Sequence, residues 1–145
     1  MQNNPFPTET SLTSALRMME WRVTSVHADA LKPMGLNMYQ AMSLIYIARH
    51  GHIRNINQRS IEKYLYLSNP GVSKIVGFLE RAGYVTRDPD PSDARSYLLH
   101  ATDKGIAFAE KLDGILQEAD REILKPLTAR EQDAFLALLQ KIGNV

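Results

Sequence analysis

The chain has 145 residues, enough for one domain with a full hydrophobic core and too few for two domains of ordinary size. Its 44% hydrophobic and 23% charged residues are typical of a folded globular protein, and the absence of cysteine excludes disulfides, thiolate metal sites and thiol redox chemistry. The net charge is only +1, and the small excess of Lys and Arg lies in residues 52–105, which is consistent with a local anionic partner without requiring one.

The sequence gives no sign of a membrane or of export. No segment reaches the roughly 18 uninterrupted apolar residues that a membrane-spanning helix needs. The start, MQNNPFPTET, has neither the basic residues nor the apolar run of a secretory signal. We therefore expect a cytoplasmic protein with no membrane partner.

Two amphipathic helices are predicted first. In residues 11–31 apolar side chains recur three or four positions apart, from Leu12 to Ala30, which indicates a single apolar stripe. The segment KPMGLN then ends this helix. Asn37 is a good N-cap for a second helix through MYQAMSLIYIARH, which the following glycine ends.

The next two segments predict a helix-turn-helix. INQRSIEKYLYL is typical of a short helix with Ile61 and Leu65 on one face. In NPGVSKIVGFLERAG we expect Asn69 to be the N-cap and Pro70 the first helical residue. Gly83 ends this helix, whose apolar stripe consists of Val72, Ile75, Val76 and Leu79.

A hairpin and two further helices complete the pattern. YVTR and SYLLHA are short and rich in strand-forming residues, and the intervening DPDPSD predicts an irregular tip. A helix-turn-helix followed by such a hairpin is a winged helix. A long helix follows ATDKG, and a last one begins where Thr128 and Glu131 have the spacing of a capping box. The predicted fold class is mainly α with a small β-hairpin wing, a winged helix-turn-helix flanked by long helices.

The segment LERAGYVTRDPDPSDARSYLLHATDKG resembles the MarR-type transcriptional regulators. Members of that family typically carry a Leu-Glu helix end, a glycine, Val-x-Arg, a wing rich in Pro and Asp, Asp-x-Arg, and a Thr-x-Lys-Gly start of the next long helix. The close match covers residues 68–105, and the rest agrees in the order and length of elements. The matching positions are Leu79, Glu80, Gly83, Val85, Arg87, Pro89, Asp90, Asp93, Arg95, Thr102, Lys104 and Gly105.

The resemblance implies a homodimer built from both chain ends, with the second helix of each helix-turn-helix in a DNA major groove and each wing at a minor groove. We expect one domain, residues 1–145, in which residues 37–101 form the DNA-binding region and residues 8–36 and 102–145 the helical dimerisation region. The implied partner is a pseudo-palindromic operator in double-stranded DNA. Glu62, Tyr66, Gly71, Asp88 and Ala94 depart from the residues usual in the family.

Eight residues are candidates for DNA contacts. On the second helix of the helix-turn-helix, small or hydrogen-bonding residues remain once the apolar stripe turns inward. In the wing, Asp93 is expected either to pair with Arg87 or to accept turn amides, which leaves Arg95 for the minor groove. The alternatives are a solvated helix face and a surface ion pair of an ordinary hairpin. The candidates are Asn69, Pro70, Gly71, Ser73, Lys74, Arg87, Asp93 and Arg95.

Methionines and aromatic residues gather on the first two helices. They are candidates for a cavity that binds a small aromatic ligand, and the alternative is that they are ordinary core residues. The set is Trp21, Met38, Tyr39, Met42 and Tyr46. The four histidines lack the spacing and the carboxylate neighbours of a metal site, so we expect no metal and no cofactor.

These patterns favour a sequence-specific, dimeric DNA-binding transcriptional regulator, in the form of a ligand-responsive repressor. The alternative is a winged-helix protein-interaction module without DNA binding, which the weak basicity and the residues Glu62, Asp88 and Ala94 favour. An enzyme is not expected, because the sequence has no nucleophile–base pair, glycine-rich phosphate loop or metal cluster.

Overall fold

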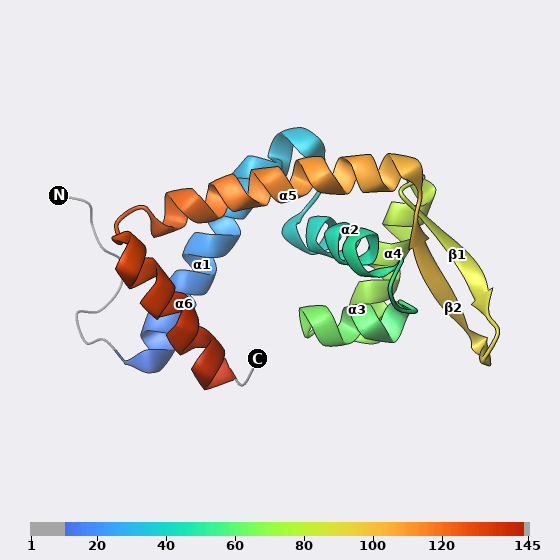
Figure 1. Cartoon of the computed structure of the whole chain (residues 1–145), viewed down its shortest axis with the longest axis horizontal. Coiled ribbons are helices and arrows are strands. Elements are labelled where there is room, and N and C mark those ends of the chain that lie inside the picture. Colours follow the sequence, from blue (N-terminus) through green and yellow to red (C-terminus); the bar gives the residue numbers. More distant parts are fainter. Residues whose placement is uncertain (1–10, 144–145) are drawn as a thin grey trace.

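The computed structural model describes residues 11–143, which form six α-helices and one antiparallel hairpin (Figure 1). This confirms the predicted fold class. Residues 8–10 and 144–145 of the expected dimerisation region lie outside the described residues. The elements are α1 (Leu12–Leu31), the 3-10 turn η1 (Lys32–Met34), α2 (Met38–His50), α3 (Gln58–Leu65), α4 (Asn69–Arg81), β1 (Val85–Asp90), β2 (Asp93–Ala101), α5 (Asp103–Leu124) and α6 (Ala129–Gly143).

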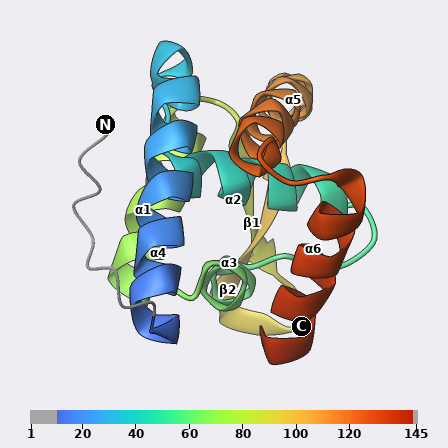
Figure 2. The same ribbon diagram turned by 90° about the vertical axis from the view of Figure 1, so that its left-hand side faces the viewer.

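Helix α5 runs along one side of the molecule and connects its two parts (Figure 1). At one end lie α2, α3, α4 and the hairpin, and at the other end lie α1 and α6. Both α1 and α2 pack along α5. Figure 2 shows α1 and α6 on opposite sides of the view.

The helix starts follow from the side chains that cap them. The Asn37 side-chain oxygen accepts from the backbone amide of Gln40 at 2.9 Å, and the Gln40 side-chain oxygen accepts from the backbone amide of Asn37 at 2.9 Å. The predicted cap of α2 is therefore confirmed. Asn57 and Ser60 form the same reciprocal pair at the start of α3. A good cap satisfies amides that the first helical turn leaves unpaired.

The predicted N-cap of α4 is wrong by one residue. Ser68 is the N-cap, with an extended backbone, and Asn69 is the first helical residue. Pro70 still lies in the first turn, where its missing N–H leaves no hydrogen bond unmade. Ser68 and Asn69 are both capping residues, so the local sequence does not separate the two registers.

The core lies between the helix-turn-helix, the hairpin and α5. The α4 stripe is buried as predicted, and each such side chain contributes about 1.5–3 kcal/mol relative to full exposure. The hairpin joins this core through Val85 and Leu99. The largest fully buried side chains are Leu31, Leu44, Ile47, Ile56, Ile61, Leu79, Leu99 and Leu112.

The hairpin runs from Val85 opposite Ala101 to Pro89 opposite Tyr97, and its register shifts between Pro89 and Asp90. Its base is tied to the loop before α3, because the Leu99 amide donates to the Ile56 carbonyl at 2.7 Å. The hairpin therefore has a fixed orientation relative to the helix-turn-helix.

The Thr-x-Lys-Gly segment joins α5 to the end of α4. The Thr102 hydroxyl donates to the Gly83 carbonyl at 2.7 Å, and Lys104 Nζ donates to the Ala82 carbonyl at 2.7 Å. A Cβ at Gly105 would lie 2.0 Å from the carbonyl oxygen of Tyr84. Residue types that recur in the MarR resemblance thus form a structural junction in this chain.

Helix α3 ends in a conformation that costs energy. Tyr66 has φ 54° and ψ 37°, in the left-handed region, and its side chain is 84% exposed. A non-glycine residue pays about 1–2 kcal/mol there, whereas glycine does not. Tyr66, one of the positions that depart from the family, therefore adopts a conformation that glycine would adopt without this cost.

We predict that Tyr66→Gly stabilises the protein by about 0.5–1 kcal/mol, because the relief of strain exceeds the entropy that glycine gains in the unfolded chain. Urea unfolding followed by circular dichroism measures this. Tyr66→Ala is the control, since it removes the ring but keeps the strain. Equal effects of the two substitutions would contradict the explanation.

None of the helices within residues 11–143 is long and apolar enough to cross a membrane. Instead, α1 and α6 present exposed apolar side chains at the end of the molecule that lies away from the hairpin. No residue of α6 is buried. The exposed apolar residues of the two helices are Leu12, Leu16, Trp21, Leu136, Leu138, Leu139 and Ile142.

Candidate nucleic-acid interface

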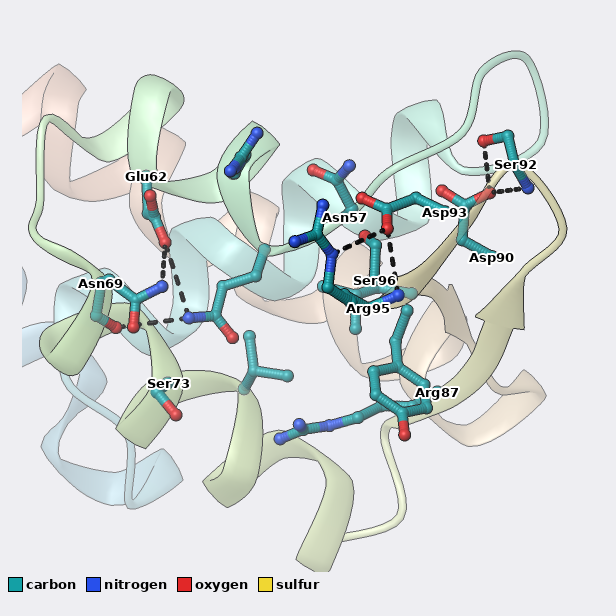
Figure 3. A pocket seen from close by; sticks show the side chains of 15 residues that line it. Asn57, Glu62, Asn69, Ser73, Arg87, Asp90, Ser92, Asp93, Arg95 and Ser96 are labelled. Carbon is teal, nitrogen blue, oxygen red and sulfur yellow. Dashed lines mark hydrogen bonds and ion pairs between the residues drawn. The ribbon is translucent and has the colours of Figure 1, made fainter.

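A groove of 740 Å³ lies between the helix-turn-helix and the wing (Figure 3). One side is formed by α3 and the start of α4, and the other by the hairpin. The groove brings together five of the eight predicted DNA-contacting residues. These are Asn69, Ser73, Arg87, Asp93 and Arg95.

The other three predicted residues lie on α4 outside this groove lining. Pro70 and Lys74 are exposed and Gly71 is half-buried. A Cβ at Gly71 would have no neighbour nearer than the Ser68 hydroxyl at 3.9 Å. The first two turns of α4 therefore present small or hydrogen-bonding residues outward, while their apolar stripe faces the core.

The Asn69 side chain is held by α3. Its Nδ2 donates to Glu62 Oε1 at 2.9 Å (Figure 3). Gln58 Nε2 donates to the backbone carbonyl oxygen of Asn69 at 3.3 Å and lies 3.5 Å from Glu62 Oε1. The departure at Glu62 thus gives a hydrogen-bonded link across the helix-turn-helix.

The wing presents Arg95 to solvent. Asp93 Oδ1 accepts from the Arg95 amide at 3.0 Å, and the Arg95 Nε is 3.8 Å from the same oxygen. The Arg95 side chain is 95% exposed. Of the two roles expected of Asp93, the structure shows the one in which it accepts a turn amide.

The tip is shaped by a second carboxylate. Asp90 Oδ1 accepts from the amide and the hydroxyl of Ser92, at 2.8 and 2.7 Å. These two hydrogen bonds hold the pKa of Asp90 below its ordinary value. The tip residues are therefore positioned by short-range hydrogen bonds of the turn itself.

The other role expected of Asp93, an ion pair with Arg87, is wrong. Arg87 Nε lies 2.9 Å from Glu80 Oε2, an ion pair without hydrogen-bond geometry, and the guanidinium runs back along α4 near Gly77. The reason is tertiary, because the end of α4 brings Glu80 nearer to the β1 arginine than the hairpin brings Asp93. Arg87 is 29% exposed, so it presents less charge to the groove than Arg95 does.

Sequence reasoning missed the contribution of α3 to the groove. Gln58 and Glu62 are one helical turn apart and lie beside the apolar stripe of Ile61 and Leu65, where both are half-buried. No sequence signal placed that face opposite the wing. The remaining groove residues outside the prediction are Asn57, Arg59, Val76, Asp90, Ser92, Ser96, Tyr97 and Leu99.

The five candidate ligand residues are distributed over different environments. Met38, Met42 and Tyr46 are partly buried against the core, whereas Trp21 is 63% and Tyr39 40% exposed. Of the five, Tyr46 alone lines a hollow of 450 Å³. The hollow is lined by Tyr46, Arg54, Ile56, Ser60, Lys63 and Tyr64.

This hollow combines stacked rings with positive charge. Tyr46 and Tyr64 are stacked with centroids 4.3 Å apart, and Arg54 donates to the Tyr46 hydroxyl at 2.9 Å. Burial raises the pKa of the Tyr64 hydroxyl. Burial and then the nearby charges of Arg54 and Arg49 lower the pKa of His50, which contacts Tyr46.

Within residues 11–143 no three His, Asp or Glu side chains gather as a metal site would require. One histidine has a structural role instead. His27 is buried, with Nε2 2.8 Å from Asp120 Oδ1 and Nδ1 3.2 Å from Met38 Sδ. It therefore links α1 to α5 and to the start of α2.

Comparison with known proteins supports the architecture. Residues 34–96 match the sequence profile described as "MarR family". "Uncharacterized HTH-type transcriptional regulator YkoM" of Bacillus subtilis (strain 168) is 30% identical over 105 residues, which cover 72% of this chain and 65% of that protein. "HTH-type transcriptional repressor Rv2887" of Mycobacterium tuberculosis is 26% identical over 115 residues, which cover 79% of this chain and 81% of that one.

Solved structures share the fold over nearly the whole chain. The S. aureus MepR–DNA complex matches with a TM-score of 0.82 and 24% identity, covering 94% of this chain and 98% of that chain. Wild-type MarR from E. coli in the apo form matches with a TM-score of 0.76 and 24% identity, covering 92% and 98%. The helices and the wing thus have the same arrangement in these proteins.

Proposed function

We propose that the chain is a member of the MarR family of winged-helix proteins and, on that premise, a dimeric transcriptional regulator that binds specific sequences of duplex DNA, a ligand-responsive repressor. The observation that carries the proposal is the groove in which Asn69 and Ser73 of α4 lie opposite a wing with a highly exposed arginine, Arg95. A DNA-binding role also fits a cytoplasmic location.

The geometry suits docking on DNA. A major groove about 12 Å wide admits one helix, and the small residues at the start of α4 let its backbone approach base edges. The exposed wing then reaches toward the neighbouring minor groove, whose negative potential attracts arginine. Among the similar proteins, one is named a repressor and another was solved with DNA, which supports the same role here.

A protection footprint on the DNA that flanks the gene tests this function. We expect protected half-sites about one helical turn apart, and affinity that falls steeply with salt. The alternative, a protein-interaction module, is favoured by carboxylates in the same groove, Glu62, Asp90 and Asp93. Absence of salt-dependent binding to any duplex would decide for that alternative.

The dimer is proposed from the exposed apolar side chains of α1 and α6, in residues 8–36 and 102–145. A helix with no buried residue cannot be held by the fold of its own chain alone, so a second copy is the natural cover for it.

We predict that Leu138→Glu weakens the dimer at least tenfold, measured by sedimentation velocity at micromolar concentration. Gln140→Glu places the same charge on the opposite side of α6 and should leave the dimer intact. A monomeric wild type would contradict the proposal.

Two neighbouring positions on α4 should separate affinity from choice. We predict that Lys74→Ala weakens binding to specific and random DNA alike and lowers the magnitude of the salt slope by about 2, one lost phosphate contact per protomer. Ser73→Ala should instead change the ranking of operator variants, because base contacts set choice. Fluorescence anisotropy with operator variants measures both. An unchanged ranking for Ser73→Ala would remove its base-reading role.

Ligand response is part of the proposal, with Trp21, Met38, Tyr39, Met42 and Tyr46 as its candidate residues. The hollow beside Tyr46 supports a small aromatic ligand with a negative charge, since two rings stack there beside Arg54 and Lys63. Titration with sodium benzoate, followed by thermal stability and by release of DNA, tests it. No shift of either at millimolar benzoate would contradict this ligand class.

A further inference from the structure

A polar triangle spans the helix-turn-helix on its groove side (Figure 3). Its corners are Gln58 and Glu62 on α3 and Asn69 at the start of α4, and all three line the groove. Asn69 Nδ2 donates to Glu62 Oε1 at 2.9 Å, and Gln58 Nε2 donates to the Asn69 carbonyl oxygen at 3.3 Å. A side chain at the start of the recognition helix is therefore oriented by a carboxylate on the other helix.

The charge of Glu62 decides which way the Asn69 amide faces. An ionised carboxylate only accepts hydrogen bonds, so Asn69 must turn its nitrogen toward Glu62. That nitrogen carries a second hydrogen, and Asn69 Oδ1 has no hydrogen-bond partner among residues 11–143. Asn69 therefore presents one free donor and one free acceptor, side by side and in a fixed order.

We propose that Glu62 is a positioning residue that sets base choice, by holding Asn69 so that it reads adenine at one position of each half-site. In the major groove adenine presents its N6 amino donor beside its N7 acceptor, and this pair matches the free atoms of Asn69. This inference rests on the proposed DNA-binding function. It also explains how a carboxylate serves a surface that approaches phosphates.

The same charge acts against random DNA. Glu62 adds negative charge to a groove that must approach the phosphate backbone, so it weakens contacts that carry no sequence information. Specificity is a difference between two affinities, and a repulsive element widens it. Removal of the charge should therefore raise affinity for random duplexes while lowering discrimination.

The backbone of the turn after α3 does not depend on the Glu62 side chain. The turn is closed through its backbone carbonyl, which accepts from the amides of Tyr66 and Leu67. Glu62→Gln keeps the size of the side chain, but glutamine can offer either an oxygen or a nitrogen to Asn69. The orientation of the Asn69 amide is then no longer determined.

The experiment is selection from a random duplex library with full-length wild type, Glu62→Gln, Asn69→Ala and the charge-matched control Glu110→Gln, which lies on α5. We expect wild type to enrich adenine at one position of each half-site. Asn69→Ala and Glu62→Gln should both lower that preference, roughly 5- to 100-fold, at that position only. Anisotropy with an unselected duplex should show tighter binding by Glu62→Gln, and Glu110→Gln should match wild type in both assays.

The outcomes separate this inference from the function on which it rests. If wild type enriches a motif and Glu62→Gln leaves every preference unchanged, the inference is wrong while the function stands. It is also wrong if the two variants affect different positions, or if their shared position selects a base other than adenine. If wild type binds no duplex, the proposed function fails and this inference with it.

Discussion

Arg95→Ala should cost about 1–3 kcal/mol of DNA-binding free energy per wing, or about 2–6 kcal/mol for a dimer that uses both wings. The side chain is 95% exposed, and its closest partner is Asp93 at 3.8 Å, so no structural contact holds it away from DNA. An exposed pair of this kind contributes about 0–1 kcal/mol to folding. The substitution should therefore leave the thermal midpoint almost unchanged.

Salt dependence gives the sharper measurement of the same substitution. Each lost phosphate-region contact removes about one counterion equivalent, so the slope of log affinity against log salt should fall in magnitude by about 2 per dimer. Lys111→Ala removes one positive charge from α5 at a residue outside the groove, and should keep the wild-type slope. Unchanged affinity and slope for Arg95→Ala would make the wing an ordinary surface hairpin.

Asp93 should behave differently from Arg95 although the two are neighbours. Its carboxylate accepts from the Arg95 amide at 3.0 Å and so fixes the backbone that carries the arginine. Asp93→Ala frees that backbone but removes a negative charge. Affinity should fall with little or no loss of salt slope, which anisotropy at four salt concentrations can resolve. A loss of slope equal to that of Arg95→Ala would contradict the positioning role.

Local sequence determined most of the elements because each depends on neighbours along the chain. The stripe of α4, the reciprocal cap at Asn37 and Gln40, and the strands around the Pro- and Asp-rich tip all follow from spacing and residue type. The start of α4 differed by one residue because Ser68 and Asn69 have similar capping propensity. Such boundaries are decided by energies smaller than the packing of one side chain.

The parts that sequence could not predict depend on residues brought together by the fold. Arg87 pairs with Glu80 because β1 returns along the end of α4, and residue spacing in the sequence does not predict how these two segments lie. The sequence showed that Glu62 departs from the residue usual in the family. Its hydrogen bond to Asn69 was not predictable, because it depends on how α3 and α4 cross. The groove residues on α3 are of the same kind, since their helix face is predictable and what lies opposite it is not.

The junction between α4 and α5 gives the largest expected effect on stability. A Cβ at Gly105 would lie 2.0 Å from the carbonyl oxygen of Tyr84 and 2.9 Å from its carbonyl carbon, both backbone atoms that cannot swing aside. Thr102 and Lys104 hold the same two segments together by hydrogen bonds of 2.7 Å each. Alanine at position 105 would therefore push apart the two segments that the hydrogen bonds of Thr102 and Lys104 hold together.

We predict that Gly105→Ala lowers the free energy of unfolding by about 3 kcal/mol or more, the upper range for overpacking. It should also lower DNA affinity, because α5 packs on α1 and is joined at this junction to the residues that follow α4. Gly114→Ala is the matched control on the same helix. No atom lies within 4 Å of a Cβ at Gly114, so alanine there should stabilise α5 by about 0.5–1 kcal/mol through helix propensity. Urea unfolding of both variants measures the difference, and equal stability of the two would show that α5 starts without the close approach at Tyr84.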